Sequence, residues 1–81
     1  MQTFIFEQGW DHEGSEIISV LTTNKDLPEI FNENILKDVI INNNASHSDF
    51  FQIQIWEDGS LKEIWNARFN PLDYNSWTPG K

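Results

Sequence analysis

The sequence contains no cysteine, which excludes disulfide bonds, thiolate nucleophiles and thiolate zinc sites together. Packing alone must hold the fold, and a reducing cytoplasm is the natural compartment for it. The longest aliphatic runs are triplets such as Val39-Ile40-Ile41, far short of the roughly 18 residues that cross a bilayer. The N-terminus has neither the basic start nor the apolar core of a secretory signal. We therefore expect a soluble, cytoplasmic protein that does not bind membranes.

Basic residues are few, with five Lys and Arg against thirteen Asp and Glu, which gives a net charge of −8. The cations are scattered and form no stripe that follows a phosphate backbone, so we do not expect direct nucleic-acid binding. The same charge favours a basic protein surface and raises the rate of association with it. Solubility is the alternative explanation, because many small proteins are acidic without having a basic partner.

A chain of 81 residues has room for one domain. Its few glycine and proline residues indicate where the chain turns. Thr3 to Gln8 and Glu16 to Thr23 are rich in β-branched and aromatic residues, which predicts two antiparallel strands joined by a loop over residues 9–15. Asp26 before Pro28 predicts a helix start, and the spacing of the apolar residues predicts a helix to about Leu36.

The middle of the chain leaves alternatives open. Residues 37–41 fit an extension of the helix, a short buried strand or a plug of the core, and residues 42–48 predict a polar loop. Asp49 to Trp56 alternates apolar and polar residues, Asp58-Gly59 is a turn signal, and Leu61 to Phe69 returns as the second strand of a hairpin. The register has two alternatives: Trp56 opposite Leu61 and Ile53 opposite Ile64 for a two-residue turn, or Ile55 opposite Leu61 and Phe51 opposite Trp65 for a three-residue loop.

The predicted order of elements is β-β-α-β-β. It is typical of an α+β two-layer sandwich, with an antiparallel sheet of about four strands and one helix packed on one face. Residues 1–70 form this single domain, and residues 71–81 form a C-terminal segment with a short turn and a flexible tail. The predicted core consists of ten residues: Phe4, Phe6, Ile17, Leu21, Leu27, Ile30, Phe31, Ile53, Ile55 and Trp65.

The sheet face opposite the helix is expected to be bare in this arrangement. Its candidate residues are Ile5, Ile18, Val20, Phe50 and Trp56. A contiguous apolar face of this kind marks a dimer or partner interface. The alternative is that the C-terminal residues fold back and cover it, namely Leu72, Tyr74 and Trp77.

The sequence gives only weak signals for a metal-binding or catalytic site. Asp11, His12 and Glu13, with His47 and Asp49, offer side chains that bind zinc, manganese or iron, but their spacing matches no metal motif and both histidines lie in polar loops. We therefore expect no metal and no cofactor. The sequence has no Gly-x-Ser-x-Gly elbow and no glycine-rich phosphate loop, and a two-layer domain of this size has little depth for an active site. We expect that the protein is not an enzyme.

Two acidic groups and two tryptophans are the candidate partner-binding residues. They are Trp10, Asp11, Glu13 and Glu16 around the first hairpin loop, Asp26, Glu29 and Glu33 on the predicted helix, and Trp77 in the tail. Exposed tryptophan beside charged residues is typical of a protein-interface hot spot. A sugar-stacking platform is the rival function, and packing at the ends of a small core is the structural alternative.

These observations predict a small acidic protein-binding module. It would inhibit or antagonise a basic protein, such as one that handles nucleic acid. In size, acidity and element order it is comparable to phage- or plasmid-type inhibitors and immunity proteins, a comparison that rests on fold and charge alone. The alternatives are a small homodimeric domain of structural or accessory role and a domain that binds a metal or a small molecule.

Overall fold

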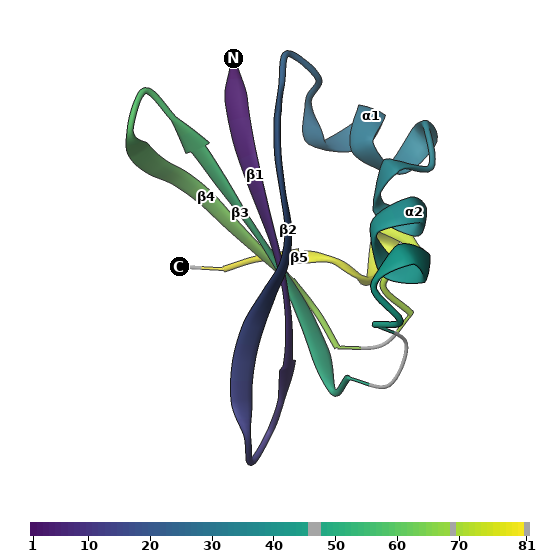
Figure 1. Cartoon of the computed structure of the whole chain (residues 1–81). Coiled ribbons are helices and arrows are strands. Elements are labelled where there is room, and N and C mark those ends of the chain that lie inside the picture. Colours follow the sequence, from purple (N-terminus) through teal and green to yellow (C-terminus); the bar gives the residue numbers. More distant parts are fainter. Residues whose placement is uncertain (46–47, 69, 81) are drawn as a thin grey trace.

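The computed structural model describes residues 1–45, 48–68 and 70–80. The fold is α+β, with five antiparallel strands in one sheet and two helices on one of its faces (Figure 1). The strands are β1 (Gln2–Trp10), β2 (Gly14–Thr23), β3 (Phe50–Glu57), β4 (Ser60–Ala67) and β5 (Thr78–Pro79), and their order in the sheet is β2-β1-β3-β4-β5. Because β1 and β3 occupy the centre, the two hairpins lie side by side. The prediction of about four strands and one helix is thus correct in class and short by one strand and one helix.

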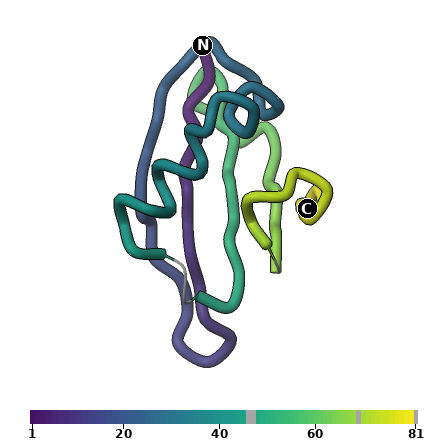
Figure 2. The backbone as a smooth tube through the Cα atoms, turned by 90° about the vertical axis from the view of Figure 1, so that its right-hand side faces the viewer, coloured from purple at the N-terminus to yellow at the C-terminus, as the bar shows by residue number. Residues whose placement is uncertain are grey.

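The single predicted helix is two helices, α1 (Leu27–Asn32) and α2 (Ile35–Asn42). Asn34 separates them in the left-handed backbone conformation, with φ of 60°. Asparagine tolerates this conformation better than most residues, because its short polar side chain bonds locally. α2 also resolves the alternatives for residues 37–41, which are helical. Both helices lie on one side of the sheet, as Figure 2 shows when viewed from that side.

Each hairpin contains a β-bulge that decides which side chains face the helices. In the first, Phe6 lies opposite Ser19 and Glu7 lies opposite Ile17, so that Ile18 is the extra residue. Ile18 then packs against the core, while Ile17 is turned to the opposite face and is 59% exposed. The prediction that Ile17 belongs to the core is therefore wrong, because one inserted residue reverses the alternation.

The second hairpin turns at Asp58-Gly59, where both residues have positive φ as a type I′ turn requires. Trp56 lies opposite Leu61, as the two-residue alternative predicts. The register then shifts between Ile55 and Trp56, so that Ile53 faces Trp65 and not Ile64. Neither alternative predicts the bulge, which places Trp65 on the helix side of the sheet.

The core lies between the sheet and the helices. Six of the ten predicted core residues are buried: Phe4, Phe6, Leu27, Ile30, Ile53 and Ile55. Three more, Leu21, Phe31 and Trp65, are partly buried and pack against the buried cluster. The sequence did not predict the other buried apolar residues, which are Leu36, Ile40, Ala45, Phe51, Ala67 and Trp77.

The outer face of the sheet, away from the helices, carries a polar network through its centre. The indole N–H of Trp56 donates to Gln54 (2.9 Å), whose amide donates to Glu7 (2.8 Å). The amide of Gln52 donates to Asn66 on the next strand (3.0 Å). These bonds, two of which cross between strands, satisfy polar groups that would otherwise need water or a ligand. The expected bare face is therefore mixed: polar side chains share it with aliphatic residues such as Ile5 on β1 and Val20 on β2.

The C-terminal segment packs on the helix side and leaves the outer face uncovered by any described element. Residues 74–76 form a short 3₁₀ turn, and Thr78–Pro79 pair with β4 where the sequence predicts a flexible tail. The Phe31 ring contacts Tyr74 and Trp77 at centroid distances of 4.9 and 5.8 Å. Across the described ranges, no helix has the length and apolarity needed to cross a membrane.

Candidate functional site

The acidic residues around the first hairpin loop lie together at one end of the sheet. Trp10 ends β1 and is partly exposed, while Asp11, Glu13 and Glu16 are exposed. Asp11 is already paired within the chain, because the Arg68 guanidinium contacts both of its carboxylate oxygens at 3.1 Å. The Glu16 carboxylate accepts a bond from the Gln8 amide (2.6 Å). Glu13 forms no ion pair with a described cation.

The acidic residues predicted along the helix have structural roles as well as charge. Asp26 is the N-cap of α1 and forms a reciprocal capping box with Glu29. Glu33 follows the helix as its C-cap, and its carboxylate lies 2.7 Å from the Lys25 ammonium. This bond to Glu33 raises the pKa of Lys25. Local structure therefore explains much of this acidic group, so Asp26, Glu29 and Glu33 are weaker evidence for a partner than the sequence indicates.

Trp77 lies in the core, which corrects the expectation that it is exposed. Its side chain is 5% exposed, and its indole N–H donates to the carbonyl oxygen of Pro71 (2.7 Å). The edge of its ring system meets the Phe31 ring. A side chain held in this way anchors the C-terminal segment to α1 and does not face a partner.

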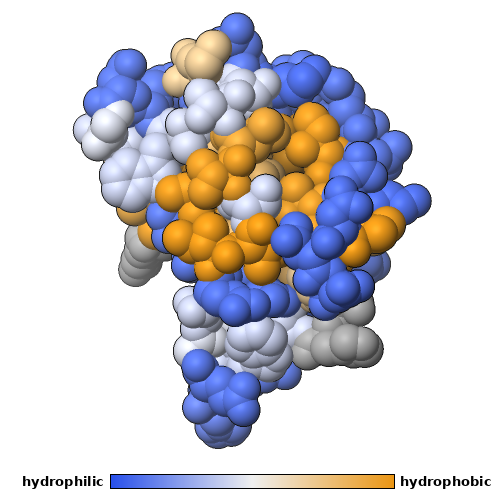
Figure 3. Space-filling view, in the orientation of Figure 1, coloured by the Kyte–Doolittle hydropathy of each residue, from blue (hydrophilic) through white to orange (hydrophobic). Residues whose placement is uncertain are grey.

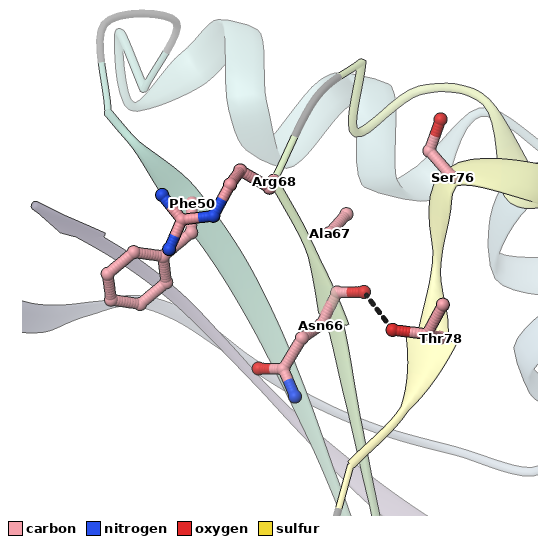
Figure 4. Close-up of a pocket in the computed structure, with 6 residues that line it drawn as sticks. All are labelled: Phe50, Asn66, Ala67, Arg68, Ser76 and Thr78. Atoms are coloured by element: carbon pink, nitrogen blue, oxygen red, sulfur yellow. Dashed lines mark hydrogen bonds between the residues drawn. The ribbon is translucent and has the colours of Figure 1, made fainter. Parts of the chain in front are cut away.

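An open hollow of about 510 Å³ lies at the β4–β5 edge and is shown in Figure 4. Its lining includes Asn66, Arg68, Ser76 and Thr78, and the Thr78 hydroxyl lies 3.5 Å from the carbonyl oxygen of Asn66. The Arg68 side chain extends over the Phe50 ring, 5.9 Å from its centroid. No carboxylate or imidazole of the described residues lines the hollow beside the two hydroxyls, so its lining supplies no nucleophile with an adjacent base.

A second hollow, of about 230 Å³, combines carboxylates with aromatic rings, and we name it the acidic hollow. Asp26 and Glu63 contribute the carboxylates, and Trp65 and Tyr74 contribute the rings, whose centroids are 6.5 Å apart. Neither carboxylate forms an ion pair with a described cation. The rest of the lining is Gln2, Leu27, Pro28 and Ile55. Carboxylates beside aromatic faces are suited to a guanidinium or an ammonium group.

Five separate parts of the sequence meet at the acidic hollow. The capping box fixes Asp26 at the start of α1, and the bulge in the second hairpin turns Glu63 and Trp65 to the helix side of β4. Tyr74 is brought there by its contact with Phe31. Trp65 also carries a buried indole N–H that has no hydrogen-bond partner in the described part of the chain. A buried donor without a partner is uncommon and costs free energy in the unbound protein.

Of the eight predicted partner-binding residues, the acidic hollow contains only Asp26. The sequence did not single out Glu63, Trp65 or Tyr74. One available signal was the alternation of β4, in which Glu63 shares its face with Trp65 and Ala67 and so places a charge on the core side of an otherwise apolar row. Such inward charges at a sheet margin are unusual without a structural or binding role.

Metal ligation finds no support in the geometry. Among the described residues, no group of three or more His, Asp or Glu side chains is arranged to hold an ion. Asp49 accepts a hydrogen bond from the backbone N–H of Asp11 (2.9 Å), and His12 lies exposed in the turn. His47, the other candidate ligand, lies outside the described residues.

Comparisons of the chain with protein-family models, with curated proteins and with solved structures give no match. Inferences about function therefore rest on the surfaces of this chain.

Proposed function

We propose that the chain is an acidic protein-binding module that binds a basic surface of its partner and inhibits or antagonises the partner by covering that surface. The observation that carries this proposal is the acidic hollow, where Asp26 and Glu63 lie beside the rings of Trp65 and Tyr74. A cationic side chain that enters the hollow would meet carboxylates and aromatic faces at once.

Several features of the hollow support a cation from a protein as its ligand. Its volume of about 230 Å³ is smaller than that of most small-molecule sites and suits a single side chain. Tyr74 is exposed and Trp65 is partly buried, so one ring is anchored while the other faces solvent. Anchored aromatic residues beside charged groups are the usual composition of interface hot spots.

The distribution of charge favours the same partner class. Three of the four described cations, Lys25, Lys62 and Arg68, are already paired with acids of this chain. Most of the thirteen acidic residues therefore remain available to attract a positive surface. Long-range attraction of this kind raises the rate of association, while the hollow would supply the specific contact.

The proposal is tested by the binding of a hexa-arginine peptide and of its hexa-citrulline counterpart, which has nearly the same shape without the charge. We expect the arginine peptide to bind, with affinity falling as salt rises, and the citrulline peptide not to bind. Asp26→Asn and Glu63→Gln should each weaken binding about threefold to tenfold, since each removes one exposed charge contact. Asn at position 26 keeps the N-cap, so the helix should remain intact.

Asp38→Asn is the matched control. It removes one exposed charge from α2, and Asp38 does not line the acidic hollow. It should change binding by less than about twofold, because it alters only the long-range attraction. If all three variants weaken binding equally, the peptide responds to net charge and the hollow is not its site.

A further inference from the structure

β2 forms one edge of the sheet and has β1 as its single strand neighbour among the described residues. It is ten residues long and contains neither lysine nor proline. The opposite edge, β5, has two residues and ends in Pro79. Natural sheets protect their edges with short strands, proline or lysine, because an open edge pairs readily with another chain. β5 is protected by this criterion, whereas β2, apart from its bulge at Ile18, is open.

Aliphatic side chains flank the β2 edge on both faces of the sheet. On the outer face, Ile17 and Val20 are more than half exposed, and the bulge places both on that face although they are three residues apart. On the helix side, Ile18 and Leu21 are partly buried against the core. A strand added beside β2 would therefore meet apolar side chains on both of its faces.

Figure 3 looks onto this edge and shows hydrophobic residues in a band across its middle, between polar ends. α2 contributes Ile35 and Val39, which are partly buried at the margin of the core. In Figure 2 the C-terminal end of α2 projects past β2. α2 thus lies on the helix side of the sheet, and its C-terminal end extends past the edge strand. This arrangement of edge strand and helix receives peptides in domains that bind by strand addition.

The overhang of α2 favours an isolated extended segment over a second copy of this chain. A copy paired antiparallel with β2 would place a second α2 on the same face of the sheet, across a two-fold axis beside the strand. Packed helices need about 8–10 Å between their axes, so two helices that both extend past β2 toward this axis would crowd each other. An extended segment carries no helix layer and avoids this clash.

For a segment that pairs antiparallel to β2, charge determines which of its ends is basic. β2 carries one charged residue, Glu16 near its start, and Glu13 lies in the turn immediately before it. A strand that runs antiparallel to β2 places its C-terminal end beside these two acids. Basic residues are therefore favoured at that end of the segment and not at the other.

We propose that β2 and α2 form a docking site for an extended aliphatic segment of a partner protein, which adds to the sheet antiparallel to β2 and carries basic residues at its C-terminal end. The inference shares with the proposed function only the class of partner. It uses the edge of the sheet that lies opposite the acidic hollow, so either surface can fail independently of the other.

The test uses an acetylated peptide of alternating valine and threonine that ends in Lys-Arg, with binding measured by calorimetry. Two control peptides separate the contributions: one has the Lys-Arg pair at its N-terminal end, and one is N-methylated at alternate residues so that it cannot complete a strand ladder. N-methylation should weaken binding at least about tenfold, and moving the basic pair should weaken it about threefold to tenfold.

Variants of the chain complete the test. Val20→Lys introduces a charge at the open edge and should weaken peptide binding at least about tenfold. Leu61→Lys changes an exposed aliphatic residue on β4 and should leave binding unchanged. Binding that ignores N-methylation or Val20→Lys would overturn the proposal. Sedimentation that shows a dimer, converted to monomer by Val20→Lys, would overturn it in favour of a second copy.

Discussion

The Asp26 side chain accepts a hydrogen bond from the backbone N–H of Glu29 (3.1 Å), and the Glu29 carboxylate accepts one from the backbone N–H of Asp26 (3.2 Å). Each residue thus satisfies an N–H that the first turn of α1 would leave without a partner. The same Asp26 lines the acidic hollow, so it combines a structural role with a place in the candidate site.

These two roles can be separated by substitution. Asp26→Ala should lower the free energy of unfolding by about 1 kcal/mol, because the cap acceptor is lost, while Asp26→Asn should lower it by much less. Denaturant unfolding monitored by circular dichroism measures both. Equal destabilisation by the two variants would show that the charge of Asp26, and not its capping bond, supports the helix.

A second prediction concerns Trp77, which the structure places in the core. Trp77→Ala should lower the free energy of unfolding by about 3–5 kcal/mol, since it removes a buried ring and its contact with Phe31. Trp10→Ala, at a partly exposed position, should cost clearly less in the same unfolding experiment. Similar midpoints for Trp77→Ala and the parent protein would mean that the C-terminal segment does not pack as described.

A third prediction follows from the close approach of Phe50 to Gly9. A Cβ atom added at Gly9 would overlap the Phe50 ring, over which Arg68 also extends. Gly9→Ala should therefore destabilise the fold by about 1–3 kcal/mol. Phe50→Ala removes the obstacle, so the double variant should be more stable than the sum of the two single changes predicts. Additive effects of the two substitutions would argue against this contact.

The sequence predicts the elements whose signals are local. Alternation identifies the strands, and Asp58-Gly59 identifies the turn of the second hairpin, because these patterns depend on neighbouring residues alone. The two bulges depend on how strands pair, which single-strand alternation does not encode, and the first of them explains why Ile17 was misplaced. The break at Asn34 was missed for a related reason, since Ile30 and Ile35 keep an apolar face on either side of it.

The acidic hollow was beyond sequence reasoning because it is assembled by long-range packing. Asp26 and Glu63 come from different layers of the fold, and Tyr74 reaches the hollow only because Phe31 and Trp77 hold the C-terminal segment against α1. Residue type and spacing do not reveal such contacts. The sequence did indicate the relevant chemistry, which is an excess of carboxylates with few cations to neutralise them.

A fourth prediction concerns metal. Since no described cluster is arranged to hold an ion, neither zinc nor manganese nor a chelator should shift the melting temperature beyond experimental error. Differential scanning fluorimetry at stoichiometric metal measures this directly. A rise of several degrees would revive the alternative of a metal-binding domain.

The most direct test of the central claim is an NMR titration with N-acetyl-arginine amide. The chain has four tryptophans, so it should show four indole N–H signals, and Trp65→Phe assigns the one in the acidic hollow. We predict that the Trp65 signal shifts progressively as the arginine derivative is added, while the Trp10 signal at the far hairpin stays in place, and that Glu63→Gln reduces the shift. Movement of the Trp10 signal with no change at Trp65 would contradict the account and assign cation binding to the hairpin end.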